Sequence, residues 1–212
     1  MFLIVGGNSE IGAATARHLR EQGERVISTT RRIAGGSDGQ AVLDFDRPLA
    51  ACIIVAVARL AACQADPQGS ALINCERTIE LVDRLVADGI YTLFLSTNQV
   101  FDGQVPQVPA DAPVAPVSEY GRQKASTEQA LKERMAAGAG VGILRLAKVV
   151  SPGMALIQNW RGELAAGRPI RAFSDMTMAP TPTDLVARAI AAMLQDAVPV
   201  TAQLTGPREV SY

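Results

Sequence analysis

A tyrosine and a lysine, Tyr120 and Lys124, lie four residues apart in this 212-residue chain. On a helix this spacing places both side chains on one face, one turn apart. A free tyrosine titrates near about pH 10, so its phenol is a poor proton donor at neutral pH. A neighbouring ammonium group stabilises the phenolate and lowers that pKa, which would make the pair suited to acid–base chemistry. The alternative is an ordinary solvated helix face, because the spacing alone is weak evidence.

A glycine-rich turn near the N-terminus is the second candidate site. The apolar run 2–5 is followed by Gly-Gly-Asn-Ser-Glu-Ile-Gly at 6–12, then by a helical pattern and by a second strand pattern at 25–30. Strand, glycine turn, helix and strand in this order are the setting in which such a turn binds a dinucleotide. The alternative is a plain strand–turn–helix whose glycines only shape the backbone.

Each residue of the turn has an expected part in that binding. Gly6 permits the tight turn, and Gly12 permits close packing of the helix on the strand. Ser9 stands where the usual pattern has its middle glycine, so the backbone approach of a ligand is less free. With Glu10 and Ile11 these residues form the helix N-terminus, whose free N–H groups and positive dipole end would face a pyrophosphate.

Strands and helices alternate along the rest of the chain. Most strand candidates are continuous apolar runs, as expected for a parallel sheet that is covered on both faces. We therefore predict an α/β fold with a doubly wound parallel sheet, the Rossmann fold. The predicted strands are 2–5, 25–30, 41–44, 52–57, 91–96 and 141–146, and the predicted helices are 11–22, 71–88, 119–137, 154–166 and 183–195. The proline-rich segment 104–116 reads as an extended loop and a candidate wall of a substrate cleft.

Composition narrows the class of protein. The net charge of −1 gives no basic footprint for nucleic acid or an anionic membrane. No apolar run reaches membrane-spanning length, and Met1 leads into a strand without a basic leader, so we expect a cytoplasmic protein. The three cysteines lack metal-ligand spacing, and His18 is the single histidine. Metal sites and histidine-based triads are therefore not expected.

Several motifs carry a family resemblance. They are Ser-Thr-Asn-Gln-Val-Phe-Asp-Gly at 96–103, Pro-x-x-Pro-x-x-x-Tyr-Gly-x-x-Lys at 113–124, Glu128, Arg145, Asn74, Asp175 and Pro-Thr-x-x-Asp-Leu at 180–185. With them the chain resembles the extended short-chain dehydrogenase/reductases of the NAD-dependent epimerase/dehydratase superfamily. Among these it is most similar to the dTDP-4-dehydrorhamnose reductase branch. The departures are Ser9, Arg77 in place of a glycine, and Asn-Gln at 98–99 in place of Asp-Tyr.

The resemblance implies a set of catalytic roles. Tyr120 would deliver a proton to a carbonyl oxygen as a nicotinamide hydride reaches the carbon, and Lys124 would lower the pKa of that tyrosine and bind the nicotinamide ribose. Thr97 would polarise the carbonyl; Ser96 is the less favoured alternative. Asn74 would support the active-site backbone, unless it only caps a helix.

The resemblance also implies a nicotinamide cofactor, and charge at the second strand favours NADP over NAD. Arg31 and Arg32 follow that strand where an NAD-binding protein usually has a carboxylate, and guanidinium groups suit a 2′-phosphate. Two solvated loop arginines are the alternative, and NAD remains open. Further cofactor contacts are expected from the pair Asp44 and Phe45 and from the run Ala56, Val57 and Ala58.

We expect residues 1–150 to form the dinucleotide-binding domain and residues 151–212 a shortened substrate lobe, which predicts an open site with weak affinity for nucleotide-sugars. The predicted function is NAD(P)H-dependent reduction of a carbonyl compound or nucleotide-sugar. The alternatives are a sugar epimerase or dehydratase that cycles its cofactor, and a non-catalytic NADP-binding regulator. A homodimer is also open.

Overall fold

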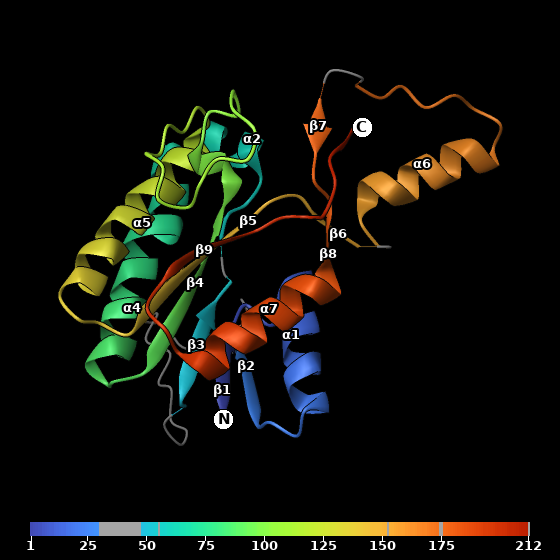
Figure 1. Cartoon of the computed structure of the whole chain (residues 1–212). Coiled ribbons are helices and arrows are strands. Elements are labelled where there is room, and N and C mark those ends of the chain that lie inside the picture. Colours follow the sequence, from blue (N-terminus) through green and yellow to red (C-terminus); the bar gives the residue numbers. More distant parts are fainter. Residues whose placement is uncertain (30–47, 55, 152, 174–175, 212) are drawn as a thin grey trace.

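A computed structural model describes residues 1–29, 48–54, 56–151, 153–173 and 176–211 of the chain (Figure 1). Within these residues six strands form one sheet in the order β2-β1-β3-β4-β5-β9, and every neighbouring pair is parallel. This confirms the predicted doubly wound parallel sheet. The strands are β1 (Phe2–Val5), β2 (Val26–Thr29), β3 (Ala50–Ile53), β4 (Tyr91–Thr97), β5 (Val141–Leu146) and β9 (Thr201–Leu204).

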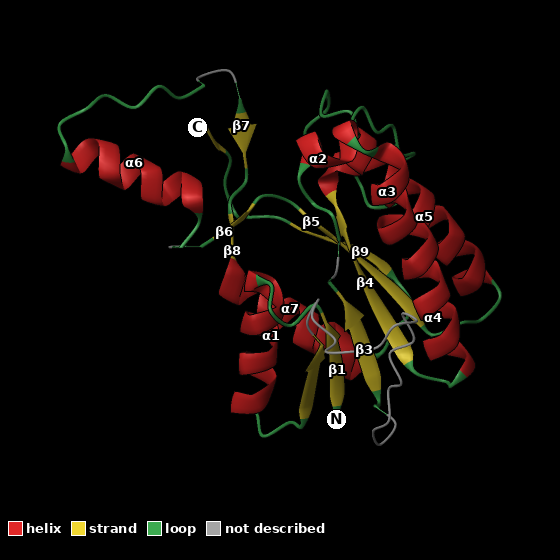
Figure 2. Cartoon of the chain, turned by 180° about the vertical axis from the view of Figure 1, so that it is seen from behind, coloured by secondary structure: helices red, strands yellow, loops and turns green. Residues whose placement is uncertain are grey.

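Helices cover both faces of this sheet (Figures 1 and 2). α1 (Glu10–Glu21) and α7 (Thr183–Asp196) lie on one face, and α4 (Thr78–Ala87) and α5 (Glu119–Ala136) lie on the other. Neighbouring residues of β4 enter opposite cores, because successive strand side chains point to opposite faces. Leu93 packs in the core under α1 and α7, whereas Phe94 packs in the core under α4 and α5. The continuous apolar runs of the sequence are the consequence of this double burial.

The region before β4 differs from the prediction of one helix over 71–88. The chain forms α2 (Leu60–Ala65), α3 (Pro67–Ala71), a π-helical turn η1 (Leu72–Arg77) and then α4. Pro67 begins α3 because proline lacks an N–H and suits the first helical position. The predicted strand 52–57 corresponds to β3, which ends at Ile53. The predicted strand 41–44 lies outside the described residues.

The segment after residue 150 contributes to the sheet and also extends away from it. α7 and β9 belong to the layers of the main sheet, and the short polar strand β9 was not predicted. α6 (Ala155–Ala165) has no buried residue and lies apart from the sheet (Figure 1). Two small ladders complete this end: β6 (Val149–Val150) pairs with β8 (Thr181–Pro182), and β7 (Thr177–Met178) pairs with β10 (Val210–Ser211). The boundary at residue 150 stays a prediction.

One further expectation concerns membranes. Among the described helices, none has both the length and the apolar character needed to cross a bilayer.

Candidate active site

The candidate residues gather where the parallel strands end. β1, β3, β4 and β5 run in one direction, so their carboxyl ends meet at one edge of the sheet. From β1 the sheet continues to β2 on one side and to β3 on the other, which makes this point the topological switch. Ligands of doubly wound folds bind in the crevice at such a switch.

The glycine turn after β1 is closely packed. Gly6 has a φ of 94°, in the region that favours glycine. Ser9 is the N-cap of α1: its hydroxyl donates to the Gly6 carbonyl at 2.8 Å and accepts from the Gly12 N–H at 3.0 Å. A Cβ atom on Gly12 would lie 2.4 Å from the Gly6 carbonyl oxygen. Close packing at Gly12 is therefore against the turn itself and not, as predicted, against the strand.

The neighbours of Ser9 have protein partners of their own. The carboxylate of Glu10 accepts a hydrogen bond from the Ser151 hydroxyl, and Ile11 packs against the core under α1. Cofactor contacts of these residues stay predictions. Four other predicted cofactor residues lie outside the described part of the chain: Arg31, Arg32, Asp44 and Phe45.

Tyr120 and Lys124 lie on the first turns of α5, as predicted. Ser118 caps this helix by accepting the Gly121 N–H at 3.1 Å. Lys124 is only 3% exposed, and its ammonium donates to the Leu95 carbonyl at 2.7 Å. The same Nζ lies 5.9 Å from the centroid of the Tyr120 ring, so the two groups share one side of the helix.

The electrostatics of this pair differ from the sequence-based expectation. Burial, with a smaller contribution from Cys63, raises the pKa of Tyr120 to about 12, where a lowering by Lys124 was expected. Burial also lowers the pKa of Lys124 to about 8. The low-polarity surroundings of both groups disfavour their charged forms, and this desolvation is the largest cause of both shifts.

Thr97 ends β4 beside the start of α5. A Cβ atom on Gly121 would lie 2.2 Å from the Gln99 carbonyl oxygen, so this glycine lets α5 approach the turn η2 (Asn98–Val100) that follows Thr97. The Thr97 hydroxyl accepts the Gln99 N–H at 3.2 Å and still has its own proton to donate. The Ser96 hydroxyl is buried and has no hydrogen-bond partner among the described residues. The choice between the two hydroxyls stays open.

Asn74 supports the backbone that follows β3, as the sequence suggested. Its Oδ1 accepts the Val57 N–H at 2.8 Å, and its Nδ2 donates to the Val57 carbonyl at 3.1 Å. Asn74 lies inside η1 and is 1% exposed, so it is not a helix cap. Of the expected cofactor wall, Ala56 and Val57 are half-buried and Ala58 is exposed.

Gln123 is a site residue that the sequence analysis missed. It is buried between Tyr120 and Lys124 on α5 and accepts from Asn74 Nδ2 at 2.7 Å. Its position in the sequence was the available signal. Gln123 is three residues after Tyr120, and residues three apart lie on the same face of a helix.

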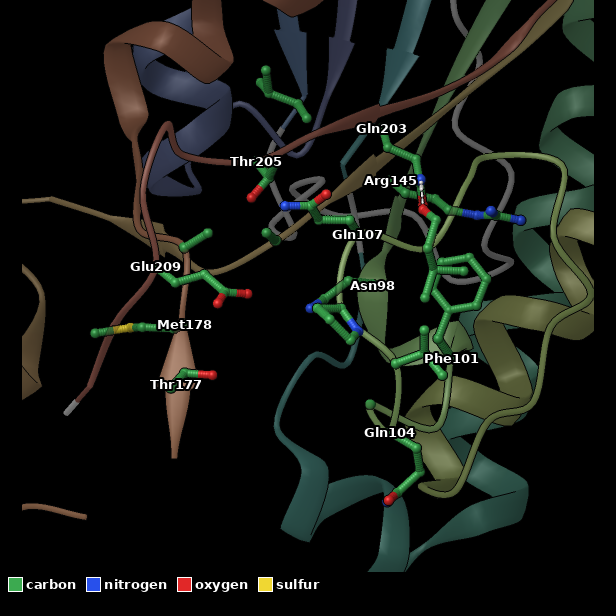
Figure 3. A pocket seen from close by; sticks show the side chains of 17 residues that line it. Asn98, Phe101, Gln104, Gln107, Arg145, Thr177, Met178, Gln203, Thr205 and Glu209 are labelled. Atoms are coloured by element: carbon green, nitrogen blue, oxygen red, sulfur yellow. Dashed lines mark hydrogen bonds between the residues drawn. The ribbon is translucent and has the colours of Figure 1, made fainter. Parts of the chain in front are cut away.

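A cavity of about 540 Å³ lies between the loop after β4 and the strands β7 and β9 (Figure 3). Its lining mixes apolar side chains with amides and hydroxyls, and Asn98 and Glu209 enter it from opposite sides. Gln203 donates to the Val108 carbonyl at 2.7 Å and ties the loop to β9. Residues 104–108 line this cavity, which agrees with the predicted wall at 104–116, whereas Thr97 and Tyr120 are not among its lining residues.

A buried ion pair lies behind the cavity. The Arg145 guanidinium donates three hydrogen bonds to Glu128, at 2.9, 3.1 and 2.6 Å, and both side chains are 1% exposed. Its Nη1 donates to the Ala110 carbonyl at 3.0 Å, and its Cζ lies 4.9 Å from the centroid of the Phe101 ring. Arg145 thereby fixes two points of the loop that forms the cavity wall.

Metal ligation has no support in the described residues, where no group of three or more histidine, cysteine, aspartate or glutamate side chains is placed to hold an ion.

Comparison with known proteins identifies proteins that are similar to this chain. A "Probable low-salt glycan biosynthesis reductase Agl14" from Haloferax volcanii is 27% identical over 207 residues, covering 84% of this chain and 65% of the relative, so the chain spans just under two thirds of that protein. The fold matches a dTDP-4-dehydrorhamnose reductase from Bacillus anthracis str. Ames in complex with NADP, with a TM-score of 0.85 and 19% identity over 99% of this chain and 76% of that one.

The fold also matches MoeE5 in complex with UDP-glucose and NAD, with a TM-score of 0.84 and 22% identity over 99% of this chain and 77% of that one. Similar structures are thus solved with NAD or NADP bound. The sequence profile described as "RmlD substrate binding domain" matches residues 1–206. The chain belongs to the RmlD substrate-binding domain family, in agreement with the resemblance that its motifs carry.

Proposed function

We propose that this chain is an NAD(P)H-dependent reductase of a carbonyl compound, with a nucleotide-sugar as its substrate class. The observation that carries the proposal is the placement of Tyr120 and Lys124 on α5, next to the strand end that bears Thr97. A phenol, an ammonium and a hydroxyl gathered at the switch edge of a parallel sheet are suited to proton transfer at a substrate oxygen.

The glycine turn fits a dinucleotide. Its backbone is packed so closely at Gly12 that no side chain fits there, and it leads directly into the N-terminus of α1 at the switch edge. When bound there, a reduced nicotinamide dinucleotide would supply the hydride. The turn at Gly6–Gly12 would hold its pyrophosphate, and the segment at Ala56, Val57 and Ala58 would form the opposite wall.

Tyr120 is the proposed proton donor. With a pKa of about 12, its phenol is fully protonated at neutral pH and can donate a hydrogen bond to a carbonyl oxygen. Transfer of the proton becomes favourable as negative charge develops on that oxygen and the charged form of Lys124 stabilises the resulting phenolate. One N–H of Lys124 is used by the Leu95 carbonyl, which leaves two to face ligand or phenol.

The hydroxyl of Thr97, or that of Ser96, would donate a second hydrogen bond to the same carbonyl oxygen. Two donors at one oxygen polarise the carbonyl and fix its position. The substrate class is supported by the similar proteins, which include the probable low-salt glycan biosynthesis reductase Agl14 and a dTDP-4-dehydrorhamnose reductase.

The test is a panel of keto- and hydroxy-nucleotide-sugars incubated with NADPH or NADH, with cofactor oxidation followed by absorbance. We expect net oxidation with a 4-keto sugar and a loss of about 10²-fold or more in Tyr120→Phe, the scale of general acid catalysis. Tyr91→Phe is the matched control, because the Tyr91 hydroxyl bonds the Val198 carbonyl and not the site.

Two results would contradict the proposal and favour another function. Interconversion of sugars without net cofactor oxidation would favour an epimerase or dehydratase that cycles its cofactor. Tight cofactor binding with no turnover of any sugar would favour a non-catalytic NADP-binding regulator.

A further inference from the structure

A buried chain of amide hydrogen bonds connects the proposed catalytic helix to the proposed cofactor wall. Gln123 is 3% exposed, and a buried side-chain amide must find partners for both its oxygen and its nitrogen. Its Nε2 donates to the Ser70 hydroxyl at 2.8 Å, to the Glu119 carboxylate at 3.0 Å and to the Pro67 carbonyl at 3.2 Å. Its Oε1 accepts from Asn74 Nδ2 at 2.7 Å.

The partners of Gln123 determine which way its amide faces. A carboxylate and a backbone carbonyl can only accept hydrogen bonds, so the NH₂ end of Gln123 must face Glu119 and Pro67. Its oxygen is then directed at Asn74. The assignment of oxygen and nitrogen in this amide therefore follows from the chemistry of its neighbours.

The orientation of the Gln123 amide also determines the orientation of the Asn74 amide. Because the oxygen of Gln123 needs a donor, Asn74 must present its NH₂ group there and its own oxygen to the Val57 N–H. Asn74 then pairs both polar groups of the Val57 backbone, at 2.8 and 3.1 Å, in the manner of a neighbouring strand. Val57 lies beyond the end of β3, where this side-chain pairing takes the place of a sheet partner.

Backbone contacts hold the two ends of this chain together. The Thr127 hydroxyl donates to the Asn74 carbonyl at 3.0 Å, and the Cys75 thiol donates to the Gln123 carbonyl at 3.3 Å. Asn74 and Cys75 lie in the π-helical turn η1, an element that is frequent at functional sites. Helix α5 and the turn η1 are therefore joined in both directions across the buried amides.

We infer that Gln123 is a positioning residue: through Asn74 it fixes the backbone at Val57, and so sets the cofactor wall relative to Tyr120 and Lys124. The inference rests on the proposed function, because it assigns Val57 to the cofactor site. Gln123 itself touches no reacting atom. We expect its replacement to lower the cofactor affinity and the protection of the Val57 amide from hydrogen exchange, and to affect the chemical step less.

The experiment compares Gln123→Met and Gln123→Glu with wild type by NADPH fluorescence titration and by amide hydrogen exchange at Val57. Methionine preserves the volume without the hydrogen bonds; glutamate preserves the acceptor for Asn74 but places a carboxylate against Glu119. We expect the cofactor Kd to rise about tenfold in both, the scale of one net hydrogen bond, and Val57 exchange to accelerate by a similar factor. Gln129→Met is the matched control, because Gln129 is exposed on the same helix and its side chain, among the described residues, bonds Glu133.

A second comparison tests whether the amides act in series. If Gln123 acts through Asn74, the double variant with Asn74→Ala and Gln123→Met should bind NADPH no more weakly than Asn74→Ala alone. Additive losses, or a Gln123→Met variant that binds NADPH as wild type, would overturn the inference in favour of simple packing. If Gln123→Met does not fold, Ser70→Ala tests the inference in its place. This variant removes one hydrogen-bond acceptor of Gln123 and should accelerate hydrogen exchange of the Val57 amide about two- to threefold. Unchanged exchange there would also overturn the inference. A wild-type chain that binds neither NADPH nor NADH would refute the proposed function instead.

Discussion

Removal of the Glu128 carboxylate should destabilise the protein strongly. In Glu128→Ala the Arg145 guanidinium loses the three hydrogen bonds at 2.6–3.1 Å and keeps, within the described part of the chain, the Ala110 carbonyl as its acceptor. Removing one partner of a buried ion pair costs about 3–5 kcal/mol, because the charge that remains is uncompensated. Against a total stability of about 5–15 kcal/mol, this is a large fraction of the folding free energy.

The assay is equilibrium urea unfolding. With a slope of about 2 kcal/mol per M, the midpoint should fall by about 1.5–2.5 M. The double variant Glu128→Met with Arg145→Met should be less destabilised than Glu128→Ala, because it leaves no buried charge at this pair. The surface pair of Arg134 with Asp83 is the control: both side chains are partly exposed, and Asp83→Ala should cost less than about 1 kcal/mol.

The reasoning would be refuted by a loss below about 1 kcal/mol in Glu128→Ala, since that lies within the range of surface pairs. A double variant as unstable as the single one would show that packing, and not the unpaired guanidinium, accounts for the loss. Because Arg145 also holds the Ala110 carbonyl and stacks on Phe101, the loop that lines the neighbouring cavity should be disturbed together with stability.

Three other outcomes are expected. Gly12→Ala places a methyl group 2.4 Å from the Gly6 carbonyl oxygen, so it should lower stability by about 1–3 kcal/mol in thermal unfolding and impair cofactor titration. Burial lowers the pKa of Lys124 from 10.5 to about 8. Between these values the unfolded chain binds more protons, so stability relative to Lys124→Met should rise with pH by about 1 kcal/mol per unit in urea unfolding, and a flat difference would contradict the lowered pKa. Alanine at both Arg31 and Arg32 should weaken NADPH binding by about 1.5–3 kcal/mol per lost contact and leave NADH unchanged in titrations, whereas equal losses would deny them any role in cofactor choice.

Local chemistry made much of this protein readable from its sequence. The apolar runs of the strands, the glycines at 6 and 12 and the helical spacing of Tyr120 and Lys124 each depend on residues close in the chain. Sheet class, the glycine turn and the helix that bears the tyrosine and lysine followed from them. The motifs at 96–103 and 113–124 then indicated the family that the profile match shows.

Other features of the fold and the site depend on contacts between residues that are distant in the sequence. Gln123 meets Asn74 across 49 positions of sequence, and no local pattern marks a glutamine whose partners lie that far away. The strand β9 is short and polar, and only its pairing with β5 makes it part of the sheet. The rise in the Tyr120 pKa has the same origin: a neighbouring lysine is visible in the sequence, but the desolvation that raises this pKa exists only once the chain has folded around the phenol.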